Sequence, residues 1–127
     1  AVMEGVVYSL RDCLEIIKEL GVEISQVRAS GGGGKSPLWR QMQADVFNYD
    51  ICTINASEGP AFGVALLAGV GAGVYSSVVE ACEATIKVKS TQKANMEAHE
   101  KYNGYYELYR RPYKSLKEDF KSLAKLV

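Results

Sequence analysis

Apolar side chains in the first twenty residues recur at intervals of three and four. These positions are Met3, Val6, Val7, Leu10, Cys13, Leu14, Ile17 and Leu20. The spacing predicts an α-helix that buries one stripe, and Gly21 is a residue type that commonly ends a helix. Residues 24–29, which are apolar at positions 24, 27 and 29, predict a strand that stops at a run of four glycines.

The segment after the glycines repeats the helical pattern. It covers residues 37–47 and is followed by an apolar run at residues 51–54, which predicts a second strand. The residues expected to face inward from the helix are Met42, Val46 and either Leu38 or Trp39. The order helix, strand, helix, strand favours the α/β fold class with parallel strands.

Small residues dominate the next predicted helix, at residues 60–70, and let its backbone approach a neighbour closely. A short helix at residues 78–84 and an edge strand at residues 86–88 are predicted next. The polar residues 90–95 predict a loop.

A long helix is predicted from residue 96 to residue 126. Its tyrosines recur at spacings of three and four, and they are Tyr102, Tyr105, Tyr106, Tyr109 and Tyr113. Pro112 lies within this helix and must kink or divide it, because proline lacks the N–H that the helix needs. The chain is expected to divide into a helix–strand–helix–strand–helix core at residues 1–75 and an extension at residues 76–127.

The glycines at residues 31–34 carry the strongest functional signal. Consecutive glycines can adopt positive φ and let a ligand approach the backbone without meeting a Cβ atom. The next residues predict an immediate helix start, with Ser36 as N-cap and Pro37 as the first helical residue. A strand, a glycine turn and a helix N-terminus in this order suit a nucleotide.

Two other interpretations of this segment compete with a nucleotide-binding turn. Residues 29–36 fit a relaxed phosphate-loop pattern, in which Lys35 would reach the β- and γ-phosphates and Ser36 would ligate Mg²⁺. Pro37 follows too closely for that loop, and no strand that ends in an aspartate follows to hold the metal. A flexible linker is the second alternative, and the flanking strand and helix start argue against it.

Residues 29–47 run from Ala-Ser-Gly-Gly-Gly-Gly through Ser-Pro-Leu-Trp-Arg-Gln to Ala-Asp. They resemble the adenosine motif of the FGGY carbohydrate kinases, and within that family they are most similar to the xylulokinases. Residues 58–69 resemble the last core helix of the family, and residues 102–116 resemble its C-terminal helix. The three matches occur in the family's order and span the chain.

The resemblance implies an incomplete part of an actin-like, ribonuclease-H-like ATPase domain. It also implies a longer parent kinase that transfers a phosphoryl group from ATP, with Mg²⁺, to the 5-hydroxyl of D-xylulose. The family holds its catalytic aspartate, its Mg²⁺ and most sugar contacts upstream of this region. We therefore expect this chain to be a fragment with no catalytic or metal-binding residue, inactive alone, and with an exposed sheet edge.

The resemblance places the adenosine of ATP or ADP against Gly31, Gly32 and Gly33, with Ser36 near the adenine edge. The main role of Ser36 is expected to be capping of the helix. Lys35 is expected to be a solvated side chain, with any phosphate contact secondary.

The other polar and aromatic residues have simpler interpretations. Trp39 is expected in the core and Arg40 at the surface or at a domain contact. Glu58 and Gly59 open a predicted helix, where an acidic residue compensates the helix dipole. The tyrosines of the last helix are expected to pack against the rest of the kinase or a partner subunit. Residues without a catalytic context are His99, Asp12, Asp45, Asp50 and Asp119.

The amino-acid composition limits which binding partners the chain can attract by its overall charge. Fifteen basic and fifteen acidic residues leave no net charge, so no global field attracts nucleic acid or an anionic membrane. Three separated cysteines, Cys13, Cys52 and Cys82, fit reduced side chains of a cytoplasmic protein better than a disulfide framework or a zinc site. A homodimer is compatible with the family resemblance.

Other functions stay open on sequence alone. Glycerol, gluconate, ribulose and rhamnulose kinases share the same general C-terminal architecture, so the sugar is not fixed. A different class of function is a standalone interaction module, in which the glycine turn is structural and the tyrosine-rich tail binds a protein. Selective binding of adenine nucleotides would separate the kinase from that module.

Overall fold

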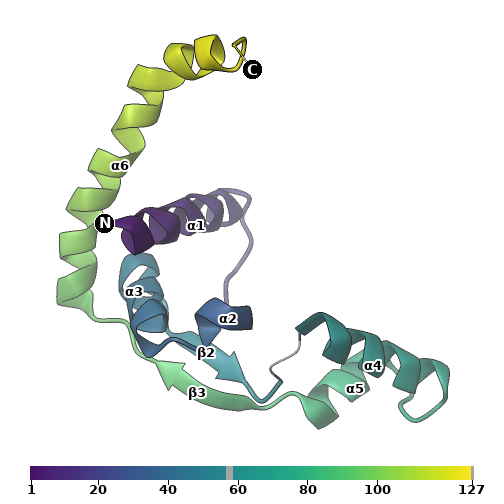
Figure 1. Cartoon of the computed structure of the whole chain (residues 1–127). Coiled ribbons are helices and arrows are strands. Elements are labelled where there is room, and N and C mark those ends of the chain that lie inside the picture. Colours follow the sequence, from purple (N-terminus) through teal and green to yellow (C-terminus); the bar gives the residue numbers. More distant parts are fainter. Residues whose placement is uncertain (57–58, 127) are drawn as a thin grey trace.

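The computed structural model describes residues 1–56 and 59–126 of the chain. Its elements are α1 (Val2–Glu19), β1 (Val27–Arg28), α2 (Gly31–Gly34), α3 (Pro37–Phe47), β2 (Ile51–Ile54), α4 (Gly59–Gly71), α5 (Val78–Thr85), β3 (Val88–Gln92) and α6 (Met96–Leu123). Figure 1 shows α1, α3 and α6 gathered beside the small sheet, while α4 and α5 form a pair beyond the end of β2 that leads into α4.

Side-chain caps fix where several helices begin. The Ser36 hydroxyl accepts a hydrogen bond from the Trp39 N–H at 3.3 Å, and Pro37 is the first residue of α3. Asn48 ends this helix in the left-handed conformation, with φ of 56°. The predicted bounds of 37–47 are therefore confirmed, because both ends are set by local residues. Ser77 and Asn95 cap α5 and α6 in the same way.

The sheet has the strand order β1-β2-β3. β1 is parallel to β2, as the sequence predicts, with Val27 opposite Ile51. β3 is antiparallel to β2, and an irregularity in their register lies between Thr53 and Ile54. Within the described residues the outer edge of β1 has no partner strand, which leaves the open edge that the sequence leads us to expect.

Two strand predictions are wrong in extent. The strand expected at residues 24–29 is only Val27–Arg28, since β1 and β2 pair only at these two residues. The strand expected at residues 86–88 begins at Val88 and continues to Gln92, through residues predicted to be a loop. Polar residues occupy this strand because it lies at the exposed edge, where the Ser90 hydroxyl meets that of Thr53 across the strands at 2.6 Å.

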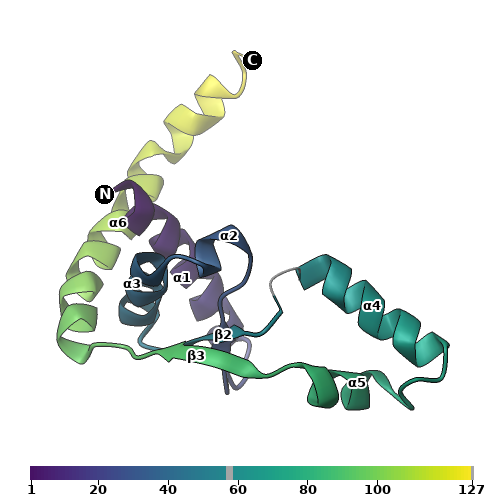
Figure 2. The same cartoon turned by 60° about the horizontal axis from the view of Figure 1, so that its bottom comes forward.

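The core lies where α1, α3 and α6 meet the sheet (Figure 2). Val7 of α1, Val46 of α3 and Ile51 of β2 are completely buried. Of the positions expected to face inward from α3, Val46 is buried and Met42 and Trp39 pack against the core, whereas Leu38 is 62% exposed. Burial of these few side chains is the main force that holds the helices on the sheet.

The tyrosines of α6 divide between the core and the surface. Tyr106 is buried, and the rings of Tyr102 and Tyr106 lie 6.3 and 6.0 Å from that of Tyr8 on α1. The prediction that these two tyrosines pack against the rest of a kinase or a partner subunit is therefore wrong, because α1 of the same chain covers them. Tyr105 and Tyr113 are more than half exposed.

Asp45 joins α3 to the start of α6. Its buried carboxylate accepts a hydrogen bond from the Asn95 backbone N–H at 2.9 Å and from the Gln41 amide at 2.7 Å. Its backbone carbonyl oxygen lies 2.8 Å from Nδ1 of His99. The Gln and Ala-Asp positions of the sequence motif thus have a structural role in this fold.

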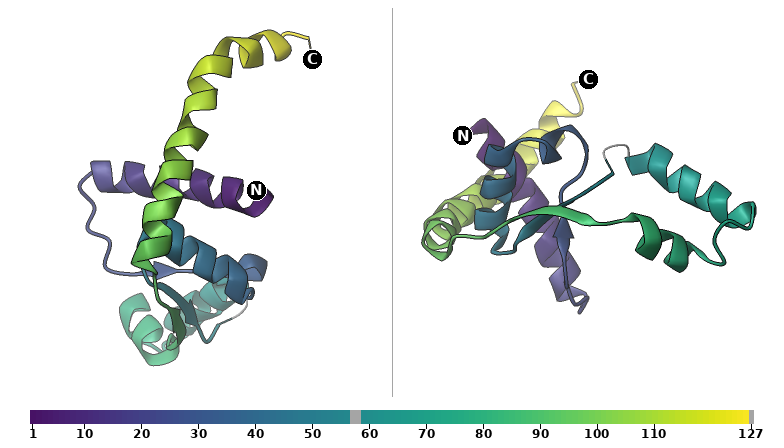
Figure 3. Two further views of the ribbon diagram at one scale, coloured as in Figure 1. Left: turned by 90° about the vertical axis from the view of Figure 1, so that its left-hand side faces the viewer. Right: turned by 90° about the horizontal axis from the view of Figure 1, so that it is seen from below.

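Pro112 does not divide α6. The helix continues through it to Leu123, although Pro112 has no N–H to donate to the carbonyl of Leu108. Figure 3 shows the ribbon of α6 turning from its straight course in its last turns, so the expected distortion takes the form of a bend.

The α4–α5 pair packs mainly on itself. Tyr75, in the connection between the two helices, lies against Gly69, where an added Cβ would come within 3.1 Å of the ring. Val64 and Leu67 of α4 and Val79 of α5 are largely exposed. The apolar helix α4 is too short to cross a membrane. Among residues 1–56 and 59–126, no helix is both long enough and apolar enough to do so.

Candidate functional site

The four glycines form a single helical turn, α2, called here the glycine turn (Gly31–Gly34). Ser30 before it is extended, and Gly31 enters the turn with φ of 68°. Positive φ is therefore needed at one glycine of the run and not at all four. A residue with a side chain would be strained at Gly31.

The glycines differ in what an added side chain would meet. At Gly33 a Cβ would lie 3.2 Å from Nε1 of Trp39, and at Gly34 it would lie 3.0 Å from the backbone of Ala29. A side chain at either of these two glycines would therefore crowd its neighbour. At Gly31 and Gly32 no heavy atom lies within 4 Å of such a Cβ, so the backbone there is open to a ligand.

A hollow of about 440 Å³ lies beside the glycine turn, at the carboxyl ends of β1 and β2. Gly31 and Gly34 form part of its wall, and Lys35, Arg40 and Lys89 add positive charge. Crevices at the carboxyl ends of parallel strands are the usual ligand sites of open α/β sheets. Among the described residues that line it none is a carboxylate, so the hollow suits an anionic ligand rather than a metal ion.

The structure brings the predicted site residues together only in part. Gly31, Gly32 and Gly33 are exposed and consecutive on one turn, and Gly31 also borders the hollow. Ser36 is half-buried and its oxygen caps α3, which agrees with the expected main role. The cap uses one lone pair of the Ser36 oxygen, so the hydroxyl hydrogen can still be donated to another acceptor.

The backbone geometry disfavours a phosphate loop. The N–H groups of Lys35 and Ser36 donate to the carbonyls of Gly32 and Gly33, at 3.2 and 3.1 Å. A phosphate loop needs such N–H groups for the phosphates. The side chain of Lys35 is exposed, as expected.

Two residues next to the glycine turn have contacts that sequence reasoning missed. Nη1 of Arg40 donates to the Gly34 carbonyl at 2.6 Å, although Arg40 was expected to contact solvent or another domain. The indole of Trp39 faces Gly33 as well as the core. The signal for these contacts is the position of both residues in the first turn of a helix that follows the glycines directly.

The residues that the sequence leaves without a catalytic context include two with structural contacts. His99 and Asp45 meet in the structural contact between α3 and α6, and Gly59 begins α4. Glu58 lies outside the described residues. Within residues 1–56 and 59–126, no group of three or more His, Cys, Asp or Glu side chains is placed to hold a metal ion.

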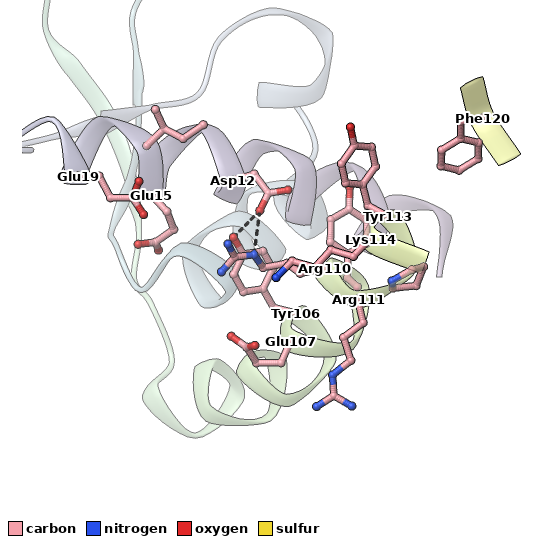
Figure 4. Close-up of a pocket in the computed structure, with 13 residues that line it drawn as sticks. Asp12, Glu15, Glu19, Tyr106, Glu107, Arg110, Arg111, Tyr113, Lys114 and Phe120 are labelled. Atoms are coloured by element: carbon pink, nitrogen blue, oxygen red, sulfur yellow. Dashed lines mark hydrogen bonds and ion pairs between the residues drawn. The ribbon is translucent and has the colours of Figure 1, made fainter. Parts of the chain in front are cut away.

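A larger hollow, of about 760 Å³, lies between α1 and α6 and away from the glycine turn (Figure 4). Acidic side chains of α1 face basic side chains of α6 across it, and Asp12 lies 3.9 Å from Nε of Arg110. Burial, reinforced by a hydrogen bond to Asp12, raises the pKa of Tyr106. Tyr106 is therefore a neutral packing residue. Although this hollow is the larger of the two, we do not take it as the candidate nucleotide site.

Comparison with known proteins identifies the family. The family model described as the C-terminal domain of the FGGY family of carbohydrate kinases matches residues 1–72. The chain is 41% identical to the xylulose kinase of Staphylococcus epidermidis over 118 residues, which are 93% of this chain and 24% of that protein. The chain thus spans about a quarter of the length of the curated relatives it matches.

Solved structures share the fold. A ligand-bound xylulose kinase from Lactobacillus acidophilus matches 97% of this chain and 25% of its own, with a TM-score of 0.87 and 22% identity. A glycerol kinase from Plasmodium falciparum with ADP matches 87% of this chain and 23% of its own, with a TM-score of 0.70 and 21% identity. The fold class is thus the expected α/β one, an incomplete portion of the actin-like ATPase fold of sugar kinases. The chain belongs to the FGGY family of carbohydrate kinases, and its residues 1–72 are part of the C-terminal domain of that family.

Proposed function

We propose that this chain is the C-terminal, adenine-nucleotide-binding part of a xylulokinase, which converts ATP and D-xylulose to ADP and D-xylulose 5-phosphate. The observation that carries the choice of sugar is the 41% identity to a xylulose kinase over 93% of the chain. A parent protein about four times longer is supported by the share of the relatives that the chain covers.

Adenosine is proposed to lie on the exposed backbone of Gly31, Gly32 and Gly33, with the Ser36 hydroxyl near the adenine edge. The open space over Gly31 and Gly32 supports this placement, because a flat base needs backbone without side chains. The positively charged hollow at the carboxyl ends of β1 and β2 lies next to this surface and favours the charge of a polyphosphate.

The residues present fit a nucleotide and do not fit a metal ion. Mg²⁺, when bound with ATP, would neutralise charge on the phosphates during transfer. Its ligands, the catalytic base and most sugar contacts are proposed to lie in the upstream part of the parent. This chain binds and orients the adenosine, so alone it should have no kinase activity.

Location, assembly and division of the chain remain proposals. A cytoplasmic location is supported by three cysteines that are all free. The exposed tyrosines Tyr105 and Tyr113 leave surface for contact with the rest of the parent or with a second copy in a homodimer. A boundary near residue 75 lies close to the end of the family match at residue 72.

The test is a kinase assay on the protein encoded by the complete reading frame that contains this chain, called the parent protein below. With ATP and Mg²⁺, D-xylulose should be phosphorylated with a higher kcat/KM than glycerol, gluconate or ribulose. A preference for one of those three would retain the family and reject the sugar. No phosphorylation of any of them, with no ADP binding, would favour the interaction module.

A further inference from the structure

Four consecutive glycines need external contacts to keep one shape. Glycine loses more conformational freedom on folding than any other residue, and a single helical turn is too short to be stable by itself. The glycine turn nevertheless has a defined geometry, so its neighbours must supply the constraint. The contacts that do so come from the first turn of α3.

We propose that Arg40 and Trp39 are positioning residues that hold the glycine turn in the shape that receives the nucleotide. This inference rests on the proposed function. Neither residue is assigned a contact with adenosine. Arg40 acts through Gly34, and Trp39 acts through Gly33.

Arg40 holds the C-terminal end of the turn. Its Nη1 donates to the carbonyl of Gly34 at 2.6 Å, and its own backbone N–H donates to the carbonyl of Ser36 at 3.1 Å. Carbonyls at a helix C-terminus lack intrahelical partners and carry partial negative charge. A permanently charged guanidinium satisfies that need, and hydrogen bonds to charged groups are among the stronger ones in proteins.

Trp39 holds the face of the turn. The position that a Cβ of Gly33 would occupy lies 3.2 Å from Nε1 and 3.3 Å from Cδ1 of the indole, so the ring leaves no room between them. The ring is partly buried against the core, and its backbone N–H is fixed by the Ser36 cap. The turn therefore cannot collapse toward α3, and its open side stays exposed.

The first experiment measures the turn without a ligand. Peptide-resolved hydrogen exchange of the parent protein is compared with Arg40→Met, which has similar length but donates no hydrogen bond. Arg28→Met is the matched control, because Arg28 is exposed on β1 and lies outside the hollow. We expect the amides of residues 31–36 to exchange about tenfold faster in Arg40→Met, while peptides from β2 and β3 stay unchanged.

The second experiment measures the affinity of the same variants for adenosine by calorimetry, because Arg40 also lines the hollow proposed for the polyphosphate and adenosine carries no phosphate. Arg40→Met should raise the Kd for adenosine about tenfold, Arg40→Lys should recover part of the loss by restoring a donor, and Arg28→Met should have no effect. At saturating ATP the kcat should stay within about twofold, because Arg40 is proposed to act on nucleotide binding and not on the transfer step.

Unchanged exchange at residues 31–36 in Arg40→Met would overturn the inference. So would faster exchange with an unchanged Kd, because the turn would then bind without being held. A parent protein that binds no ADP at all would reject the proposed function, and the exchange measurement would still decide whether Arg40 holds the turn.

Discussion

The hydroxyl of Tyr106 donates a hydrogen bond to the Asp12 carboxylate at 2.5 Å and so joins α6 to α1. The two guanidinium groups of Arg11 and Arg110 lie over the same ring, at 4.2 and 5.6 Å from its centre. Tyr8 of α1 packs beside it and is also buried. Burial is the first cause that raises the pKa of Tyr8 to about 12, and it raises that of Tyr106 as well.

These two tyrosines should make the fold sensitive to alkaline pH. Both folded-state pKa values lie above the ordinary value of 10.0, so below that pH both states keep the proton. Above it the unfolded chain loses its protons first, and the free energy of unfolding should fall as pH rises. The expected slope is about 1.4 kcal/mol per pH unit for each tyrosine. Urea unfolding of the chain between pH 9 and 11 measures it.

The control for this prediction is Tyr106→Phe, which removes the contribution of Tyr106 and leaves that of Tyr8. Its slope above about pH 10 should be smaller than that of the unchanged chain by about 1.4 kcal/mol per pH unit. Equal slopes would show that Tyr106 is not protected from ionisation in the folded state.

Asp45 should matter more for stability than its less buried neighbour Asp50. Asp45→Ala leaves the Gln41 amide and the Asn95 N–H without their shared acceptor, and we expect it to lower the free energy of unfolding by about 2–3 kcal/mol. Asp50→Ala is the control, because Asp50 also accepts a backbone hydrogen bond, from the Ala94 N–H, but its carboxylate and its ion pair with Lys93 are more exposed and should contribute less. Urea denaturation compares them, and an equal loss in both variants would argue against the role of Asp45.

The four glycines should respond unequally to alanine. Gly34→Ala places a Cβ 3.0 Å from the Ala29 backbone, which cannot move freely, so the chain should be destabilised by about 1–3 kcal/mol. Gly32→Ala meets no heavy atom within 4 Å and should be neutral or slightly stabilising. Thermal unfolding of the two variants measures the difference. A reversed order would mean that the turn has another conformation.

Replacement of Pro112 should straighten and stabilise α6. Pro112→Ala restores the N–H that the Leu108 carbonyl lacks, and proline within a helix costs about 3 kcal/mol relative to alanine. Ellipticity at 222 nm and the urea midpoint should both show a more stable helix. Pro37→Ala is the control, because proline is favoured at the first residue of a helix and its removal should bring no gain. A gain in both variants would contradict this account.

Local signals made part of the fold predictable. Ser36, Pro37 and Asn48 set both ends of α3, and the apolar run at residues 51–54 matches β2. β3 was misplaced because its polar residues owe their conformation to pairing with β2, a contact between segments almost forty residues apart. The partner of Tyr102 and Tyr106 was missed for the same reason, since Tyr8 is far away in sequence.

The position of the candidate site in the chain was predictable from the sequence, but the side-chain contacts that hold the glycine turn were not. The glycine run and the helix start are consecutive in sequence, so their neighbourhood in space follows directly. The contact from Arg40 to Gly34 depends on one side-chain conformation, and that of Trp39 with Gly33 depends on how α2 is placed on α3. Asp45 was left without a role because its partner, Asn95, lies fifty residues away.

The most direct test of the account is calorimetric titration of the parent protein with ADP and GDP, together with its Gly32→Val and Lys35→Ala variants. A Cβ at residue 32 would meet no heavy atom within 4 Å, and the branched side chain of valine would occupy the surface proposed for adenosine. We predict that ADP binds more tightly than GDP, that Gly32→Val abolishes ADP binding, and that Lys35→Ala changes it little. Undiminished ADP binding by Gly32→Val, or its loss in Lys35→Ala, would contradict the account.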